Sequence, residues 1–112
     1  MTSNEFRRMA LSFDETEERS HMNHPDFRAR GKIFASLHFP DKAWGMVKLF
    51  PDQQEEFVDA APEGFVPANG AWGRWGCTLV NLKIVKKSQV KKAMTLAWAN
   101  ATATKKARAR PK

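Results

Sequence analysis

The stretch FRARGKIFASLHF, residues 27–39, is the part of the sequence that indicates the fold most clearly. Apolar side chains alternate with polar or small ones on both sides of Gly31-Lys32, and alternation with period two is typical of a half-buried strand. The Gly-Lys pair interrupts this pattern over a length that suits a tight turn. The stretch therefore predicts two strands that pair antiparallel across a short connection.

The strand pattern continues downstream of this hairpin. A second turn and a third strand are expected over residues 40–49, with Val47 and Leu49 on one face and Lys48 on the other. Residues 77–84 predict a further strand, because every second side chain from Thr78 to Ile84 is apolar or small enough to share one face. Successive short strands with tight turns indicate antiparallel pairing.

Three helices are expected around these strands. The first precedes residue 14 and opens with a capping box at Thr2-x-x-Glu5, the second covers residues 51–61, and the third runs from a cap at Ser88 to residue 101. An acidic turn is predicted over residues 14–18 and a loop over residues 62–76. The order α-β-β-β-α-loop-β-α predicts an α+β domain with two layers, an antiparallel β-sheet packed with helices.

The net charge of +7 is unevenly distributed along the 112 residues. All 12 acidic residues lie at or before Glu63, whereas 11 basic residues follow it, five of them within the last eight positions. We therefore expect one domain over residues 1–101 and a basic tail over residues 102–112 with too few apolar side chains to fold. The basic second half favours an anionic partner.

Several classes of protein are excluded at this stage. The longest run without a charged residue, residues 93–104, is shorter than the roughly 20 residues of a membrane span, so no membrane partner is expected. Residues 1–13 show no secretory signal. The single Cys77 leaves no intramolecular disulfide and no thiolate metal cluster. We expect a cytoplasmic protein.

No catalytic, metal or cofactor site is predicted. His21 and His24 have a spacing that metal ligands can use, but no fourth ligand accompanies them. No base or carboxylate lies at a sequence position that would indicate a catalytic pair with Cys77. The glycines within residues 70–76 match neither a dinucleotide fingerprint nor a phosphate loop. The sequence therefore predicts a binding protein and not an enzyme.

The most informative local feature is NGAWGRWG, residues 69–76. Trp72 and Trp75 flank Arg74, and an exposed indole can stack on a base while the guanidinium meets a phosphate. The alternative is that an indole folds back over the sheet. This packing interpretation is favoured for Trp72, and both interpretations stay open for Trp75.

A second basic cluster spans the end of the last strand and the start of the last helix. No acidic residue interrupts it or follows it, and it predicts a surface that contacts phosphates. A solvated helix face is the alternative. Its members are Lys83, Lys86, Lys87, Lys91 and Lys92.

Three stretches together resemble the MmcQ/YjbR family. They are SHMNHPDFRARGKIFA at residues 20–35, Val47-Lys48-Leu49 leading to Gln53-Gln54, and FVPANGAWG at residues 65–73 with Thr78. The resemblance covers roughly residues 4–101. It implies a CyaY-like, double-wing α+β fold with a DNA-binding label, a functional inference that rests on the fold alone.

The family pattern falls on specific positions of this chain. Most are turn formers or packing aromatics, whereas Lys32 and Lys48 are polar positions that packing does not explain. Cys77 departs from the pattern where an aromatic residue is common, and Leu79 and Asn81 replace basic residues on the outer face of their strand. The matched positions are His24, Pro25, Phe27, Gly31, Lys32, Phe34, Lys48, Pro67, Gly70, Trp72, Gly73 and Thr78.

Two functions are expected from these observations. The first is DNA binding of low sequence specificity, with phosphate contacts from Arg28, Arg30, Lys32, Arg74, Lys86, Lys87, Lys91 and Lys92. The second is a small-ligand or protein-interaction module built on the loop of residues 72–75, with a cleft formed by His24, Lys32, Lys48, Trp72 and Trp75.

Overall fold

The structure is a computed structural model that describes residues 1–21 and 23–103. The described elements are α1 (Ser3–Leu11), β1 (Thr16–His21), β2 (His24–Ala29), β3 (Lys32–Leu37), β4 (Trp44–Lys48), α2 (Pro51–Ala60), β5 (Phe65–Pro67), α3 (Gly70–Arg74), β6 (Cys77–Asn81) and α4 (Lys87–Thr102). The strands form one antiparallel sheet in the order β1-β2-β3-β4-β6-β5. The predicted α+β class, an antiparallel sheet packed with helices, is confirmed.

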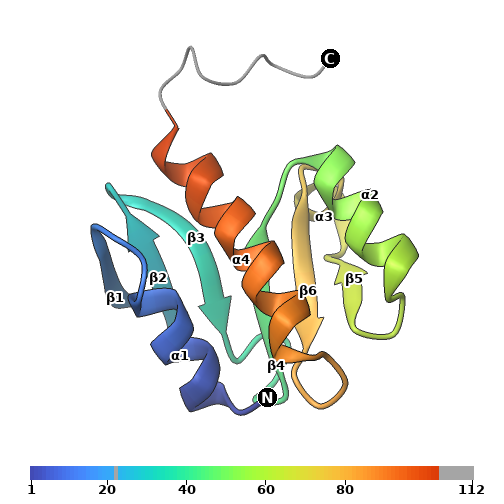
Figure 1. Cartoon of the computed structure of the whole chain (residues 1–112), viewed down its shortest axis with the longest axis horizontal. Helices are drawn as coiled ribbons and strands as arrows, with labels where there is room; N and C mark the ends of the chain where they lie inside the picture. Colours follow the sequence, from blue (N-terminus) through green and yellow to red (C-terminus); the bar gives the residue numbers. More distant parts are fainter. Residues whose placement is uncertain (22, 104–112) are drawn as a thin grey trace.

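The core lies between the sheet and the helices that cross it. Figure 1 shows α4 running across the middle of the sheet. Helix α1 lies beside α4, on the side of the sheet where β1 is the edge strand. Phe6 of α1 packs against Phe27 of β2 with ring centroids 6.2 Å apart, and Val90 and Met94 of α4 are fully buried. Burial of apolar side chains of this size stabilises the fold by about 1.5–3 kcal/mol each.

The hairpin predicted from residues 27–39 is confirmed, but its turn lies at Arg30-Gly31 instead of Gly31-Lys32, and its second strand ends at Leu37. β2 and β3 pair antiparallel, and Arg30 and Gly31 form the turn with φ angles of 53° and 82°. Two consecutive positive φ angles match the right-handed twist of paired strands. The register shifts between Phe27 and Arg28, so that Phe34 and Ala35, which are neighbours in sequence, are both buried. The faces predicted for residues 47–49 are also confirmed.

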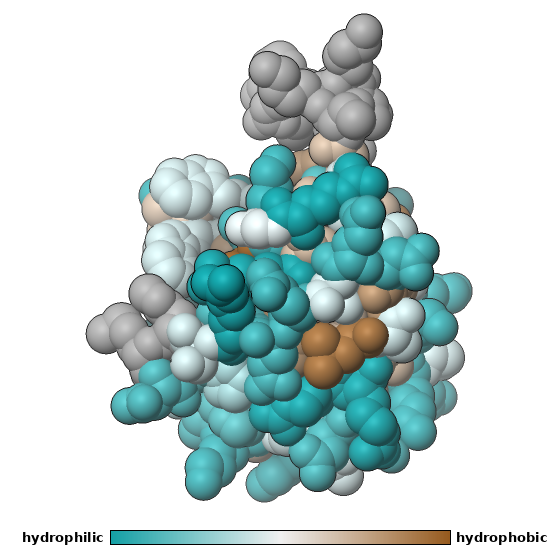
Figure 2. All heavy atoms as spheres, turned by 90° about the vertical axis from the view of Figure 1, so that its left-hand side faces the viewer, coloured by the Kyte–Doolittle hydropathy of each residue, from teal (hydrophilic) through white to brown (hydrophobic). Residues whose placement is uncertain are grey.

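The acidic turn predicted over residues 14–18 is confirmed for residues 14–15 and wrong for residues 16–18, which form a strand. Strand β1 begins at Thr16, and each of its six residues has a partner in β2. Glu17, Glu18 and Arg19 are all exposed, so the strand has no apolar face for a periodicity argument to detect. Figure 2 shows this side of the molecule covered mainly by hydrophilic side chains, as suits an edge strand that must not pair with a second chain.

The loop predicted over residues 62–76 is also wrong, because it contains β5 and α3. Three residues of β5 pair with β6 at the other edge of the sheet. Gly73 and Gly76 let α3 lie close to its neighbours: a Cβ atom would overlap the carbonyl oxygen of Ala68 at the first position and that of Leu49 at the second. Glycine is required here by close packing as well as by turn geometry.

The ends of the last strand and helix differ from the prediction. β6 ends at Asn81, and Ile84, expected on the buried face, is 51% exposed. The cap of α4 is Lys86 instead of Ser88, and its N–H donates to Gln89 Oε1 at 2.9 Å. α4 continues to Thr102, the first residue of the predicted tail, and residues 104–112 lie outside the described part of the chain.

Candidate functional site

A cleft opens where β3 and β4 stop pairing. The two strands are joined at Ala35↔Val47, Ser36↔Met46 and Leu37↔Gly45. Nearer the hairpin turn the described residues of β3 pair with β2 alone, and Figure 1 shows β3 bending away from β4 there. A cavity of about 740 Å³ lies at this end of the domain, with walls from the hairpin, the end of β4, α3 and the last turns of α4.

The cleft is positively charged. Its described lining includes Arg28, Lys32 and Lys48 and contains no acidic residue. Lys32 and Lys48 are exposed and form no ion pair with a described residue. Arg28 differs, because its Nε donates to the buried carboxylate of Asp26 at 2.9 Å, and this hydrogen bond raises the pKa of the guanidinium. Two lysines are therefore available to an anion without breaking an internal contact.

Helix α3 presents both indoles to solvent at the mouth of the cleft. Trp72 is 64% exposed and Trp75 is 69% exposed, and both line the cavity. The interpretation in which Trp72 folds back over the sheet is wrong. The backbone of α3 packs inward through Gly73, so the side chains on either side of this glycine face outward.

A buried amide holds α3 in this position. Gln54 of α2 donates from Nε2 to the carbonyl oxygens of Gly73 at 3.0 Å and Cys77 at 3.1 Å. Thr78 Oγ1 donates to the carbonyl oxygen of Gly76 at 2.8 Å. Buried carbonyl groups need such partners, and these contacts fix the short helix between α2 and β6.

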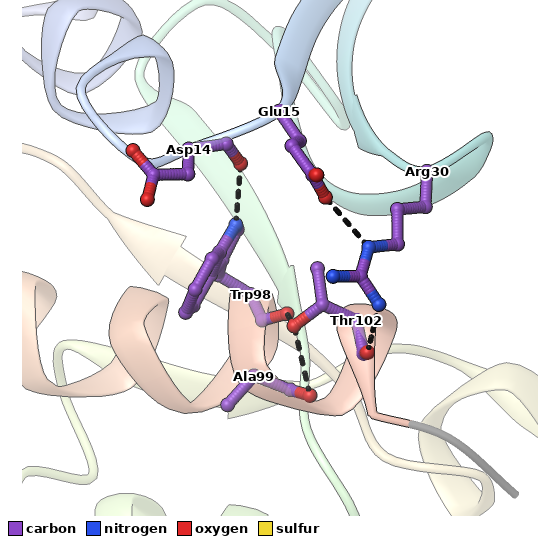
Figure 3. Close-up of polar contacts among 6 residues, drawn as sticks. All are labelled: Asp14, Glu15, Arg30, Trp98, Ala99 and Thr102. Atoms are coloured by element: carbon purple, nitrogen blue, oxygen red, sulfur yellow. Dashed lines mark hydrogen bonds and ion pairs between the residues drawn. The ribbon is translucent and has the colours of Figure 1, made fainter.

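Arg30 at the hairpin turn is engaged within the protein. Its Nε donates to Glu15 Oε1 at 2.6 Å, and its Nη1 donates to the carbonyl oxygen of Thr102 at 2.9 Å. Beside it, Trp98 Nε1 donates to the carbonyl oxygen of Asp14 at 3.0 Å. Figure 3 shows these contacts joining the hairpin and the turn before β1 to the end of α4. Arg30 therefore anchors the end of α4 at the rim of the cleft.

The lysines at the start of α4 lie away from the cleft. Lys87 pairs with Glu5 of α1 at 3.3 Å, whereas Lys86, Lys91 and Lys92 are exposed and have no ion pair within the described residues. The cleft contacts α4 from Ala97 onward, and none of these lysines lines it. Along the helix axis Lys87 lies about 15 Å and Lys92 about 7.5 Å before Ala97. The basic residues of the hairpin and the lysines of α4 therefore do not form one continuous patch.

His24 is the one predicted cleft residue that does not line the cavity. Its ring contacts Phe39 edge-on at 5.8 Å, and its Nδ1 is buried with no hydrogen-bond partner in the described part of the chain. Arg74, which lies between Trp72 and Trp75 in the sequence, is exposed on α3 and does not line the cavity. Among the described residues no group of three His, Cys, Asp or Glu side chains could hold a metal ion.

Comparison with known proteins identifies the family. The YjbR family model matches residues 11–100. The chain belongs to the YjbR family. Its fold is similar to the crystal structure of the Deinococcus radiodurans protein DR2400, described as a DUF419 domain, with a TM-score of 0.77 and 15% sequence identity over 97% of this chain and 83% of that chain. None of the curated proteins matches this chain.

The sequence pattern does not predict the part of the candidate cleft that α4 supplies. Ala97, Asn100 and Ala101 line the cleft, and Asn100 Nδ2 donates to Gln53 Oε1 at 2.8 Å. The sequence pattern assigned Ala97 and Ala101 to the buried stripe of the last helix, and no local signal distinguishes a helix face in the core from one that borders a cleft. Cys77 of β6, opposite Lys48, also lines the cleft, and burial raises the pKa of its thiol. No helix in the described part of this YjbR chain is long and apolar enough to cross a bilayer.

Proposed function

We propose that this YjbR protein binds nucleic acid with low sequence specificity in the cytoplasm, and that the cleft end of the domain is its contact surface. One observation carries the proposal: a cleft lined by three basic residues and no described acidic residue is bordered by two exposed indoles. Cationic grooves with aromatic side chains on which bases stack are a common form of nucleic-acid site. No catalytic role is proposed.

The residues of the cleft, together with Arg74 of α3, make two kinds of contact with the nucleic acid. Lys32, Lys48 and Arg74 contact phosphates, and release of the phosphate counterions supplies the affinity. Trp72 and Trp75 contact bases through their faces, which does not distinguish one base from another. Low specificity follows because the cleft offers few polar groups that could read base edges.

Three of the eight residues predicted to contact phosphates are less available for binding. Arg28, Arg30 and Lys87 already form ion pairs with Asp26, Glu15 and Glu5, respectively. A phosphate that took one of these side chains would have to compete with an internal carboxylate, and for Arg28 that carboxylate is buried. The proposed surface therefore centres on the unpaired cations of the cleft and α3.

The test compares two double substitutions with equal changes of charge. Lys32→Glu with Lys48→Glu should weaken binding of a labelled oligonucleotide by about tenfold or more at low salt, because both charges meet phosphates. Lys91→Glu with Lys92→Glu changes the net charge equally, away from the cleft, and should have a much smaller effect. Binding is measured by fluorescence anisotropy. Equal losses from both pairs would show that the net charge, and not the cleft, governs binding.

A second candidate is a module for a small anionic ligand. The observation in its favour is the cavity volume of about 740 Å³, which lies within the usual range of small-molecule sites. A nucleoside monophosphate would then change the fluorescence of Trp72 and Trp75, and oligonucleotides would bind no more tightly than the monophosphate. Titration of the intrinsic fluorescence with both ligands separates this candidate from the first.

A further inference from the structure

We infer that the cleft binds unpaired nucleotides of a single strand in preference to a duplex. The inference rests on the nucleic-acid binding proposed above and specifies its ligand. It follows from three features of the site: the exposure of the indoles, their arrangement on α3, and the position of the remaining cations around them.

The indole faces are the first feature. Neither Trp72 nor Trp75 has an aromatic partner among the described residues, whereas Trp98, elsewhere in the chain, stacks on Phe13 with centroids 5.6 Å apart. An unpaired base presents a free face to an exposed indole. In a duplex the faces are covered by the neighbouring base pairs, and only edges and phosphates are accessible. The indoles can therefore stabilise a bound single strand but add little to a bound duplex.

The spacing of the indoles is the second feature. Trp72 and Trp75 are three positions apart on a helical turn, which places their Cβ atoms about 5–6 Å from each other on the same side. Two bases of one strand can then stack on the two indoles. Gly73 cannot be replaced without displacing α3, because its position is filled by the backbone of Ala68, so the pair is held on a rigid support.

The cations are the third feature, and they favour a strand over a free nucleotide. Lys32 on the hairpin and Lys48, which pairs with Cys77 of β6, line the same cleft as the two indoles, so a strand stacked on the indoles has cations within the cleft for its phosphates. Lys32 and Lys48 belong to different strands of the sheet, so a strand with several phosphates contacts both charges, whereas a mononucleotide offers a single phosphate group.

The test uses the full chain and one labelled 12-nucleotide DNA, offered either as a single strand or annealed to its complement. We expect the single strand to bind at least about tenfold more tightly at low salt. Trp72→Ala and Trp75→Ala should each weaken single-strand binding by about fivefold or more, as removal of one stacked base–indole pair requires, and change duplex binding by less than twofold. Phe39→Ala removes a ring that is 51% exposed outside the cleft, and should change neither.

The outcomes separate this inference from the proposed function. Equal binding of the two DNA forms, unaffected by either tryptophan substitution but weakened by Lys32→Glu with Lys48→Glu, overturns the single-strand preference and leaves nucleic-acid binding standing. Failure of both forms to bind overturns both. A nucleoside monophosphate that binds as tightly as the 12-nucleotide strand overturns the preference for a strand.

Discussion

At the scale of single residues, two glycines with positive φ angles are required for different reasons. Gly76 has a φ angle of 109°, and a Cβ atom there would overlap the carbonyl oxygen of Leu49. Gly31 also has a positive φ angle, 82°, but open space surrounds the position of its Cβ. Glycine is therefore required at position 76 by both backbone conformation and close packing, and at position 31 by backbone conformation alone.

This contrast gives a prediction for stability. Gly76→Ala should lower the free energy of unfolding by about 2 kcal/mol or more, because strain and steric overlap add. Gly31→Ala should cost about 1 kcal/mol, from conformational strain only. Urea denaturation followed by circular dichroism measures both. Equal losses at the two positions would contradict the packing role assigned to Gly76.

At the scale of elements, the segments that the sequence failed to predict are those whose existence depends on a neighbour. β1 has no apolar face and exists because β2 supplies a partner for each residue. β5 has three residues paired with β6, too few for a periodic pattern. α3 is five residues long and is positioned by Gln54 from α2. By contrast, α1 was predictable with its capping box, because the hydrogen bonds of that box are local.

The support of α3 by α2 is testable at this scale. Gln54→Leu removes the amide donor from the carbonyl oxygens of Gly73 and Cys77, which keep the backbone N–H groups of Gly76 and Ala68 as donors, and each lost hydrogen bond costs about 0.5–1.5 kcal/mol. We expect that loss in urea denaturation, together with faster amide hydrogen exchange in α3. Glu55→Leu, at an exposed position of the same helix, should change neither. Unchanged exchange in α3 after Gln54→Leu would show that the amide does not hold this helix.

At the scale of the whole molecule, the basic groups are distributed over separate regions. The cleft cations lie at one end of α4 and the lysines of residues 86–92 at the other. The sequence after Ala103 begins at the rim of the cleft, where Arg30 anchors Thr102. A net charge of +7 therefore does not describe one binding surface.

Removal of the last nine residues tests how these regions combine. A chain that ends at Ala103 keeps all the hydrogen bonds and ion pairs described above, and its circular dichroism spectrum checks that it is folded. Its affinity for single-stranded DNA should fall, and the log–log salt dependence should become less steep by about 0.7 for each phosphate that the shortened chain no longer neutralises. A complete loss of binding would mean that the folded surface has no affinity of its own, which would contradict the proposed cleft.

Local periodicity and turn chemistry are sufficient to predict the hairpin of residues 27–39, the buried faces of β4 and α4, and the α+β class. The sequence also drew attention to Lys32, Lys48, Trp72 and Trp75, all of which line one cleft. The folded chain brings these four residues to one cleft and places His24 outside it, against Phe39. It also pairs Arg28 with Asp26 and Arg30 with Glu15. The physical reason is that the cleft arises where β3 and β4 stop pairing, and strand register between distant segments leaves no local pattern in the sequence.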